Sequence, residues 1–148
     1  MMRAISVLVG VLILLAVGWY VGHRPVSGLQ AEVERVEMEA ADRQAALETR
    51  AQLAEARGYL WQARADILLA SYDVSKMNYG TANEHAVAAR DLLTRAAGTP
   101  GLTLDVSGVR EMVDSAVGKI GAMEPDAHAV LMRAAAELAR LLEKTGQA

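Results

Sequence analysis

The chain has 148 residues, enough for one domain with a hydrophobic core, and 53% of them are hydrophobic. Phenylalanine and cysteine are absent, and aromatic residues make up only 4% of the chain. Without cysteine, the chain has no disulfides, thiolate metal sites or cysteine nucleophiles. The net charge is -3, and no segment gathers lysine and arginine as a phosphate-binding surface would, which argues against nucleic acid as a partner.

The first apolar segment predicts a membrane anchor. Residues 4–22, "AISVLVGVLILLAVGWYVG", carry no charge, and as a helix they would span about 28 Å, close to the hydrocarbon thickness of a bilayer. Trp19 and Tyr20 suit the membrane interface. The alternative is a cleaved signal peptide, but no A-x-A-like site follows the apolar run. We therefore predict an uncleaved single-pass anchor over residues 1–24.

The charges around this span favour a cytoplasmic amino terminus. Arg3 precedes the span, whereas His23 and Arg24 follow it and the acidic Glu32 and Glu34 come soon after. By the positive-inside rule, the carboxyl-terminal domain is expected in the periplasm. The predicted location is the bacterial inner membrane.

A long helix is expected after a short break. The segment "RPVSG" contains proline and glycine and predicts a hinge at residues 25–28. No further proline occurs until Pro100, so one helix from about Leu29 to Asn78 is the economical interpretation. Its apolar or small residues recur at spacings of four, three or seven, close to a heptad pattern, at Leu29, Val33, Val36, Ala40, Leu47, Ala54, Trp61, Ala65, Leu68 and Tyr72.

The first half of this helix, residues 29–57, predicts a stalk. It carries many charges of both signs, and Arg43 and Arg50 fall on the apolar stripe itself, which weakens a dry interface. A solvated stalk or a weak coiled coil is therefore expected. A homo-oligomer can form through this stalk or through the G-x-x-x-G pair of Gly18 and Gly22, although glycine is common in apolar spans.

Residues 58–148 predict a small antiparallel four-helix bundle, so the fold class is all-α. The segment "YLWQARADILLASYDV" after Gly58 is apolar on more than one face and needs covering partners. Three shorter helices follow, and their short loops favour antiparallel neighbours. Trp61 and Tyr72 are expected to fill the bundle where alanines leave room, rather than to line a ligand groove.

Turn signals separate these helices. Gly80 is expected to end the long helix with a positive φ, and "TANE", residues 81–84, has the pattern of a capping box that opens the next helix. That helix is expected to end at Gly98. The third follows Asp105 and ends at Gly121, by the same signals.

The last helix is expected to begin around Pro125 and Asp126. Each of the three shorter helices has one apolar stripe that should face the core. The three stripes are Ala82, Ala86, Ala89, Leu93 and Ala96; Val109, Met112, Val113, Ala116, Val117 and Ile120; and Ala127, Leu131, Ala134, Leu138 and Leu142.

One pole of such a bundle collects possible metal ligands. It would hold the ends of the first and third helices with the starts of the second and fourth. The residues there are Met77, His85, Met123 and His128, with Glu84, Glu124 and Asp126 nearby. Imidazole with thioether suits copper, and imidazole with carboxylate suits zinc or nickel. The alternative is structural, because methionines fill bundle cores and acids favour helix starts. We assign no metal and no cofactor, and keep a small-molecule or metal-binding bundle at the His85/His128 pole as a second hypothesis.

The residue patterns do not predict an enzyme. Ser71 and Asp73 have no histidine in a matching position, and neither a G-x-S-x-G elbow nor a glycine-rich phosphate loop is present. Glu84 directly precedes His85, so the E-x-x-H pair of di-iron bundles is missing as well. No catalytic residue is assigned.

Three stretches carry a family resemblance: "AEARGYLWQARADILLASYDV" at 54–74, "ANEHAVAARDLLTRA" at 82–96 and "PGLTLDVSGVREMVDSAVGKI" at 100–120. Their order resembles the helical part of HemX-type membrane proteins, the uroporphyrinogen methyltransferase-like accessory proteins of bacterial haem operons. The resemblance implies one membrane span, a coiled-coil stalk, an alanine-rich helical domain outside the cytoplasm and an accessory role. The methyltransferase label is not carried over, because no residue matches a cofactor loop.

The leading hypothesis is therefore a single-pass membrane-anchored scaffold that binds other proteins of the bacterial envelope. A third hypothesis is a tetratricopeptide-like, membrane-tethered adaptor, since the first two helices of the bundle form a hairpin with Ala70, Ala82 and Ala89 at small-residue positions. The tetratricopeptide period does not recur along the chain, which ranks this hypothesis lower.

Overall fold

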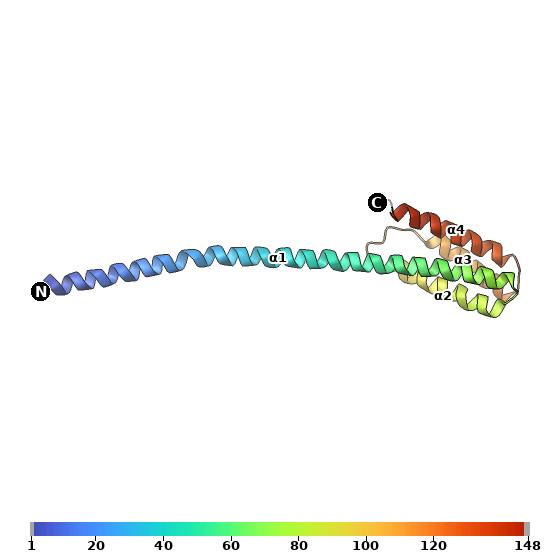
Figure 1. Ribbon diagram of the computed structural model, residues 1–148, viewed down its shortest axis with the longest axis horizontal. Coiled ribbons are helices and arrows are strands. Elements are labelled where there is room, and N and C mark those ends of the chain that lie inside the picture. The colour runs from blue at the N-terminus through green and yellow to red at the C-terminus, as the bar shows by residue number, and fades with distance from the viewer. Residues whose placement is uncertain (1, 147–148) are drawn as a thin grey trace. The chain divides into compact units, whose positions relative to one another are not determined.

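The computed structural model describes the backbone of residues 2–146 and the side chains of residues 15–20 and 29–144. Within that backbone lie four helices, α1 Met2–Ser75, α2 Tyr79–Ala97, α3 Ser107–Gly121 and α4 Ala127–Gly146, and no strand (Figure 1). The predicted all-α class is confirmed. The chain divides into two compact units, Met1–Leu47 and Glu48–Ala148.

The first unit consists of the amino-terminal part of α1. Its described side chains, at residues 15–20 and 29–47, are all exposed. The backbone is helical through residues 25–28, so the expected hinge is not a break in α1. A proline removes one backbone donor and crowds the carbonyl oxygen four residues earlier, but helical hydrogen bonds on either side of it can remain.

Among the side chains that the structure describes, no helical segment is long and apolar enough to cross a bilayer. The anchor predicted over residues 4–22 falls mostly outside this set, because the side chains of residues 4–14 and 21–22 lie outside the described residues. The same is true of Gly22 in the G-x-x-x-G pair.

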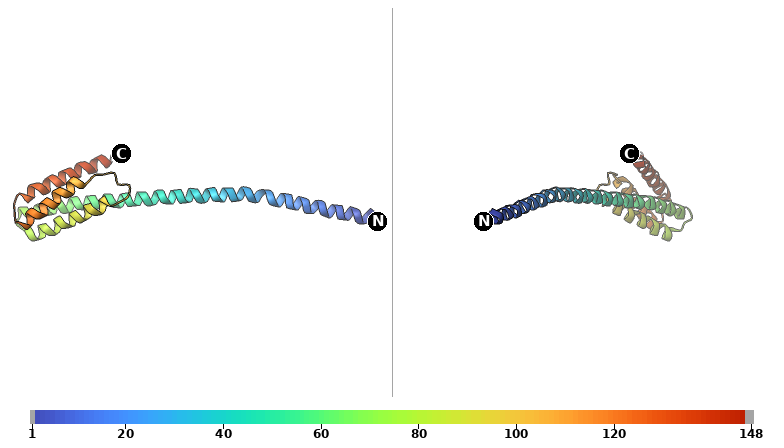
Figure 2. Two further views of the ribbon diagram at one scale, coloured as in Figure 1. Left: turned by 180° about the vertical axis from the view of Figure 1, so that it is seen from behind. Right: turned by 60° about the vertical axis from the view of Figure 1, so that its left-hand side comes forward.

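The second unit is a helical bundle made of α1 from Glu48 onward with α2, α3 and α4. α3 packs against both α2 and α4. α1 contacts α2 where Asp66 meets His85, and it contacts α4 where Ser71 meets His128. Each helix therefore borders two others, and successive helices run in opposite directions (Figures 1 and 2). This unit begins at Glu48, earlier than the boundary expected at residue 58.

The core stripes predicted for α2, α3 and α4 are confirmed. Every member is buried except Met112 and Val117, which are partly buried and pack against the core. Alanines dominate the buried face of α2, so its backbone can approach its neighbours closely. The larger aliphatic side chains of α3 and α4 fill the remaining volume, among them Ile120, Leu131 and Leu138.

α1 enters the core by a different face from the predicted one. Its buried residues are Ala56, Leu60, Ala63, Ile67, Ala70, Ser71 and Val74. The prediction that Trp61 and Tyr72 fill the core is wrong, since 55% of Trp61 and 60% of Tyr72 remain exposed. Three short helices cover only one side of α1. The side with Leu60 and Ile67 fits between alanine-rich neighbours, whereas the side with the two large rings stays outside.

α1 ends in a Schellman motif centred on Met77, which has a φ of 59°. The backbone N–H of Met77 donates to the carbonyl oxygen of Val74 at 2.9 Å, and the N–H of Asn78 donates to that of Asp73 at 2.9 Å. The predicted role of Gly80 is therefore wrong, because α2 already begins at Tyr79. These hydrogen bonds satisfy carbonyls that a helix end would leave without partners.

The predicted capping box is also wrong. Thr81 lies inside α2, and its hydroxyl accepts a hydrogen bond from the side-chain amide of Asn78 at 2.9 Å. α2 ends as expected at Gly98. α2 begins earlier than the "TANE" pattern indicates. The Schellman turn is tight and places Asn78 directly before the first residue of α2.

α3 repeats the same ending at the same pole of the bundle. Its last helical residue is Gly121, as predicted, but the left-handed residue is Met123, with a φ of 57°. The backbone N–H of Met123 donates to the carbonyl oxygen of Ile120, and the N–H of Glu124 donates to the carbonyl oxygen of Lys119, each at 2.9 Å. Two methionines thus occupy backbone positions that favour glycine.

α3 begins just after Asp105, as predicted. The carboxylate of Asp105 accepts a hydrogen bond from the backbone N–H of Ser107 at 2.9 Å, which satisfies one free donor at the start of the helix. Hydrogen bonds from the Ser107 side chain and backbone hold the pKa of Asp105 below its usual value.

Candidate functional site

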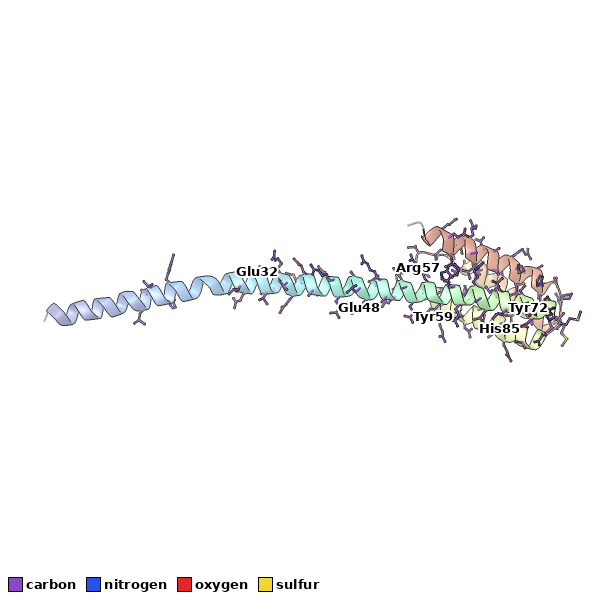
Figure 3. The ribbon with its side chains drawn as sticks, in the orientation of Figure 1. Glu32, Glu48, Arg57, Tyr59, Tyr72 and His85 are labelled. Carbon is purple, nitrogen blue, oxygen red and sulfur yellow. The ribbon has the colours of Figure 1, made fainter. Side chains whose placement is uncertain are left out.

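The two histidines of the predicted metal pole have different partners in the structure. His85 lies on α2 (Figure 3). Its Nδ1 atom is 3.4 Å from a carboxylate oxygen of Asp66 on α1. Its Nε2 atom is 3.9 Å from a carboxylate oxygen of Asp73. Asp66 and Asp73 stand two helical turns apart and so face the same neighbour, which places one imidazole between two carboxylates.

This three-residue cluster is well shielded. The side chains of Asp66, Asp73 and His85 are 17%, 16% and 31% exposed. Both distances are longer than a hydrogen bond requires, so the contacts are charge interactions that operate when the imidazole is protonated. The cluster joins α1 to α2, and sequence spacing alone could not pair His85 with these aspartates.

His128 packs against α1 at a separate place. Its Nδ1 atom lies 2.8 Å from the hydroxyl oxygen of Ser71 and 3.1 Å from the backbone carbonyl oxygen of the same residue. The sequence analysis found no histidine for Ser71, and this expectation is wrong. The two residues are 57 positions apart, so only the antiparallel packing of α4 on α1 brings them together.

The Ser71–His128 pair does not have the geometry of an activated nucleophile. A carbonyl oxygen can only accept, so the contact with the Ser71 carbonyl requires a hydrogen on Nδ1 of His128. A protonated Nδ1 cannot take the serine proton, as a general base must. Ser71 is also only 1% exposed, which leaves no access for a substrate. The pair is a hydrogen bond between helices.

The acids of the predicted pole are held by a lysine that sequence reasoning had not considered. Nζ of Lys119 lies 2.7 Å from Asp126 and 2.8 Å from Glu124. The hydrogen bond to Lys119 lowers the pKa of Asp126, and the hydrogen bonds to Asp126 and Glu124 raise the pKa of Lys119. These pairs close the α3–α4 turn.

The remaining members of the pole point to solvent. Met77 and Met123 are exposed in the two left-handed turns, and Glu84 is exposed on α2. Within the part of the chain that the structure describes, no group of three or more histidine, aspartate and glutamate side chains is arranged to hold a metal ion.

The most distinctive surface is an apolar face of α1 that the bundle does not cover. In the second unit it comprises exposed residues at alternating spacings of three and four, which we call the exposed seam: Ala51, Ala54, Gly58, Trp61, Ala65, Leu68 and Tyr72. Beside it, Leu69 is also exposed. Most of these positions belong to the stripe predicted from the sequence, in which Trp61 and Tyr72 were expected to fill the core.

Cations lie over both rings of the exposed seam. The guanidinium carbon of Arg64 is 5.8 Å from the centre of the Trp61 ring, and Nζ of Lys76 is 5.5 Å from that of Tyr72. Nε of Arg64 is buried and, within the described residues, has no hydrogen-bond partner. Each ring thus has one face against a cation and other surface open.

The first unit carries apolar side chains of the same kind. Its described large apolar residues beyond the expected anchor are exposed, and they include Leu29, Val33, Val36 and Leu47. In sequence, Leu47 comes four residues before Ala51, the first residue of the exposed seam. Both units therefore leave apolar side chains of α1 uncovered.

Comparisons with protein-family models, with curated proteins and with solved structures find no match to this chain.

Proposed function

We propose that this protein is a single-pass, membrane-anchored helical scaffold that acts by binding proteins of the bacterial envelope through α1. The exposed seam supports the binding role, because Trp61, Leu68 and Tyr72 remain open to solvent on a helix whose opposite side is buried. An exposed patch of large apolar and aromatic side chains is typical of a protein-binding surface.

The bundle gives this surface a fixed form. α2, α3 and α4 hold α1 in a helix, so a partner does not have to fold the binding element. Recognition of one helical face by another helix or by a groove uses side chains at this spacing. The bundle then acts as the support of the binding face.

The membrane anchor is supported by the sequence of residues 4–22, which has the length and the lack of charge of a single span. The flanking charges support an amino terminus in the cytoplasm and a bundle in the periplasm. The resemblance to HemX-type accessory proteins supports the same arrangement and a non-enzymatic role.

Reporter fusions after Ala148 test the location. A reporter active only in the periplasm and one active only in the cytoplasm are compared in a bacterial host. We expect activity of the periplasmic reporter and retention of the chain in membranes after alkaline carbonate extraction. Release of the full chain by carbonate would contradict the anchor.

Site-specific photo-crosslinking in cells tests the binding face. A photoreactive amino acid at Leu68 should give crosslinked products, while the same amino acid at the exposed Ser115 on α3 should not. Equal crosslinking from both positions, or from neither, would contradict a role of the exposed seam in protein binding.

A further inference from the structure

We propose that the exposed seam binds a second copy of this chain, as a parallel, in-register pair of α1 helices. This inference rests on the proposed function, since it names the partner of the same face. Three observations support it: the spacing of the seam, its position opposite the bundle core, and the charges beside it.

The spacing is that of a two-stranded coiled coil. From Leu47 to Tyr72 the steps alternate between four and three residues without interruption, through Ala51, Ala54, Gly58, Trp61, Ala65 and Leu68. Such a pattern keeps one face toward a partner helix over the whole segment. In a parallel, in-register pair each residue meets its own copy. The two Trp61 rings would meet between the helices. The neighbouring seam residues, Gly58 and Ala65, are small and leave room for these rings.

The seam faces away from the bundle. Residues nine apart in a helix lie about two and a half turns from each other and so point in opposite directions. Five seam residues each have a buried core residue nine positions further on: Ala51 with Leu60, Ala54 with Ala63, Gly58 with Ile67, Trp61 with Ala70, and Ala65 with Val74. A second α1 can therefore reach the seam without displacing α2, α3 or α4.

The charges beside the seam select the second copy and its direction. An arginine comes directly before each of the seam residues Ala51, Gly58 and Ala65; these are Arg50, Arg57 and Arg64. A glutamate or glutamine comes directly after Leu47, Ala54 and Trp61; these are Glu48, Glu55 and Gln62. These positions correspond to g and e of a heptad. The exposed seam thus has a different register from the stripe predicted from the sequence, and Arg50 lies beside it instead of on it. In a parallel pair, g of one helix lies beside the following e of the other, so Arg50 meets Glu55 of the second copy and Arg57 meets Gln62 of the second copy.

An antiparallel pair would place arginine beside arginine along the same edge, and glutamate beside glutamate along the other. Like charges at such positions oppose pairing. Glu55 is further oriented within its own helix, because its carboxylate accepts a hydrogen bond from the hydroxyl of Tyr59. The edge charges therefore favour the parallel arrangement, which also lets both anchors lie in one membrane.

Single-cysteine crosslinking of the full chain in detergent is the first test. The chain has no native cysteine, so Ala51→Cys and Ala65→Cys each introduce one thiol on the seam. Mild oxidation should convert both variants to disulfide-linked dimers, whereas Ser115→Cys on α3 should remain monomeric. Dimer from only one seam position would overturn the parallel register, because an antiparallel pair brings a residue to its own copy only at the crossing point.

Charge exchange is the second test. Arg50→Glu and Glu55→Arg should each lose most of the dimer measured by sedimentation in detergent, and the double variant should recover it. Circular dichroism checks that the helices of each variant are retained. A monomeric wild-type chain would overturn the proposal. A dimer that ignores both charge changes but is lost in Gly18→Leu would also overturn it, since the anchors alone would then associate.

Carbonate extraction of the same preparations separates the two proposals. A chain that stays in the membrane but is monomeric overturns the second copy and leaves the anchored scaffold standing. A dimeric chain that carbonate releases overturns the anchor and leaves the seam pairing standing.

Discussion

Leu60 is fully buried in the core of the bundle, and the next residue, Trp61, is 55% exposed. Successive residues of a helix point about 100° apart, so this pair marks the border between the two apolar faces of α1. One face holds the bundle together, and the other is open.

The two faces should respond differently to truncation. Leu60→Ala should lower the free energy of unfolding by about 2–5 kcal/mol, because it leaves a cavity in a closed core. Trp61→Ala should cost less than about 1 kcal/mol at a protein concentration where the chain is monomeric, since the ring is mostly exposed. Urea unfolding of the full chain in mild detergent, followed by circular dichroism, measures both. Equal losses for the two variants would contradict the assignment of faces.

Met77→Gly and Met123→Gly should each stabilise the bundle by about 0.5–1 kcal/mol. Both residues have a positive φ, a backbone conformation that is less favourable for a residue with a side chain than for glycine. Glycine also increases the entropy of the unfolded chain, and this offsets part of the stabilisation. Met132→Gly is the matched control, because Met132 is an exposed methionine in the helical backbone of α4. That control should be destabilised by about 1 kcal/mol. Stabilisation in all three variants would rule out the backbone explanation.

The Ser71–His128 hydrogen bond should couple the effects of mutations at the two residues on the free energy of unfolding. His128→Ala leaves the buried Ser71 hydroxyl without its partner, with an expected cost of about 1–3 kcal/mol. Ser71→Ala in the His128→Ala background should recover part of this loss, because it removes the unpaired group. A double-mutant cycle of urea unfolding measures the coupling. Strictly additive losses would show that the two side chains do not interact.

The ion pairs of Lys119 should make a small contribution to stability that depends on pH. Lys119 lowers the pKa of Asp126, so this contribution is present above the ordinary aspartate pKa and is lost as the pH falls below about 4 through the lowered value. The pKa of Lys119 is raised, so its contribution is complete below about pH 10 and is lost as the pH rises through the raised value.

Lys119→Met should therefore have a slightly lower Tm than the wild type near pH 7, and the difference should disappear in acid. Thermal unfolding of the two proteins between acid and neutral pH measures this. Lys119→Arg, which keeps the charge, should behave like the wild type across the range. A Tm difference that is the same in acid and at neutral pH would indicate lost packing of the lysine stem instead.

The helix ends show where sequence signals were sufficient and where they were not. Asp105 and Gly98 mark helix ends by local chemistry, so both were predicted correctly. The α1–α2 turn was not, because the sequence offered Gly80 as the obvious left-handed residue and the structure uses Met77. The position of that residue depends on where packing in the bundle ends α1, which local propensity does not set.

The sequence by itself determined the all-α class, the core stripes of α2, α3 and α4, and the regular apolar spacing along α1, because hydrophobic periodicity is a local property of each helix. Only the tertiary structure decided which of the two apolar faces of α1 is buried, since three short helices can cover one side and the choice depends on how all four pack. It also decided that His85 meets Asp66 and Asp73 while His128 meets Ser71. Those contacts join residues from different helices, and their pairing is fixed only when the helices come together.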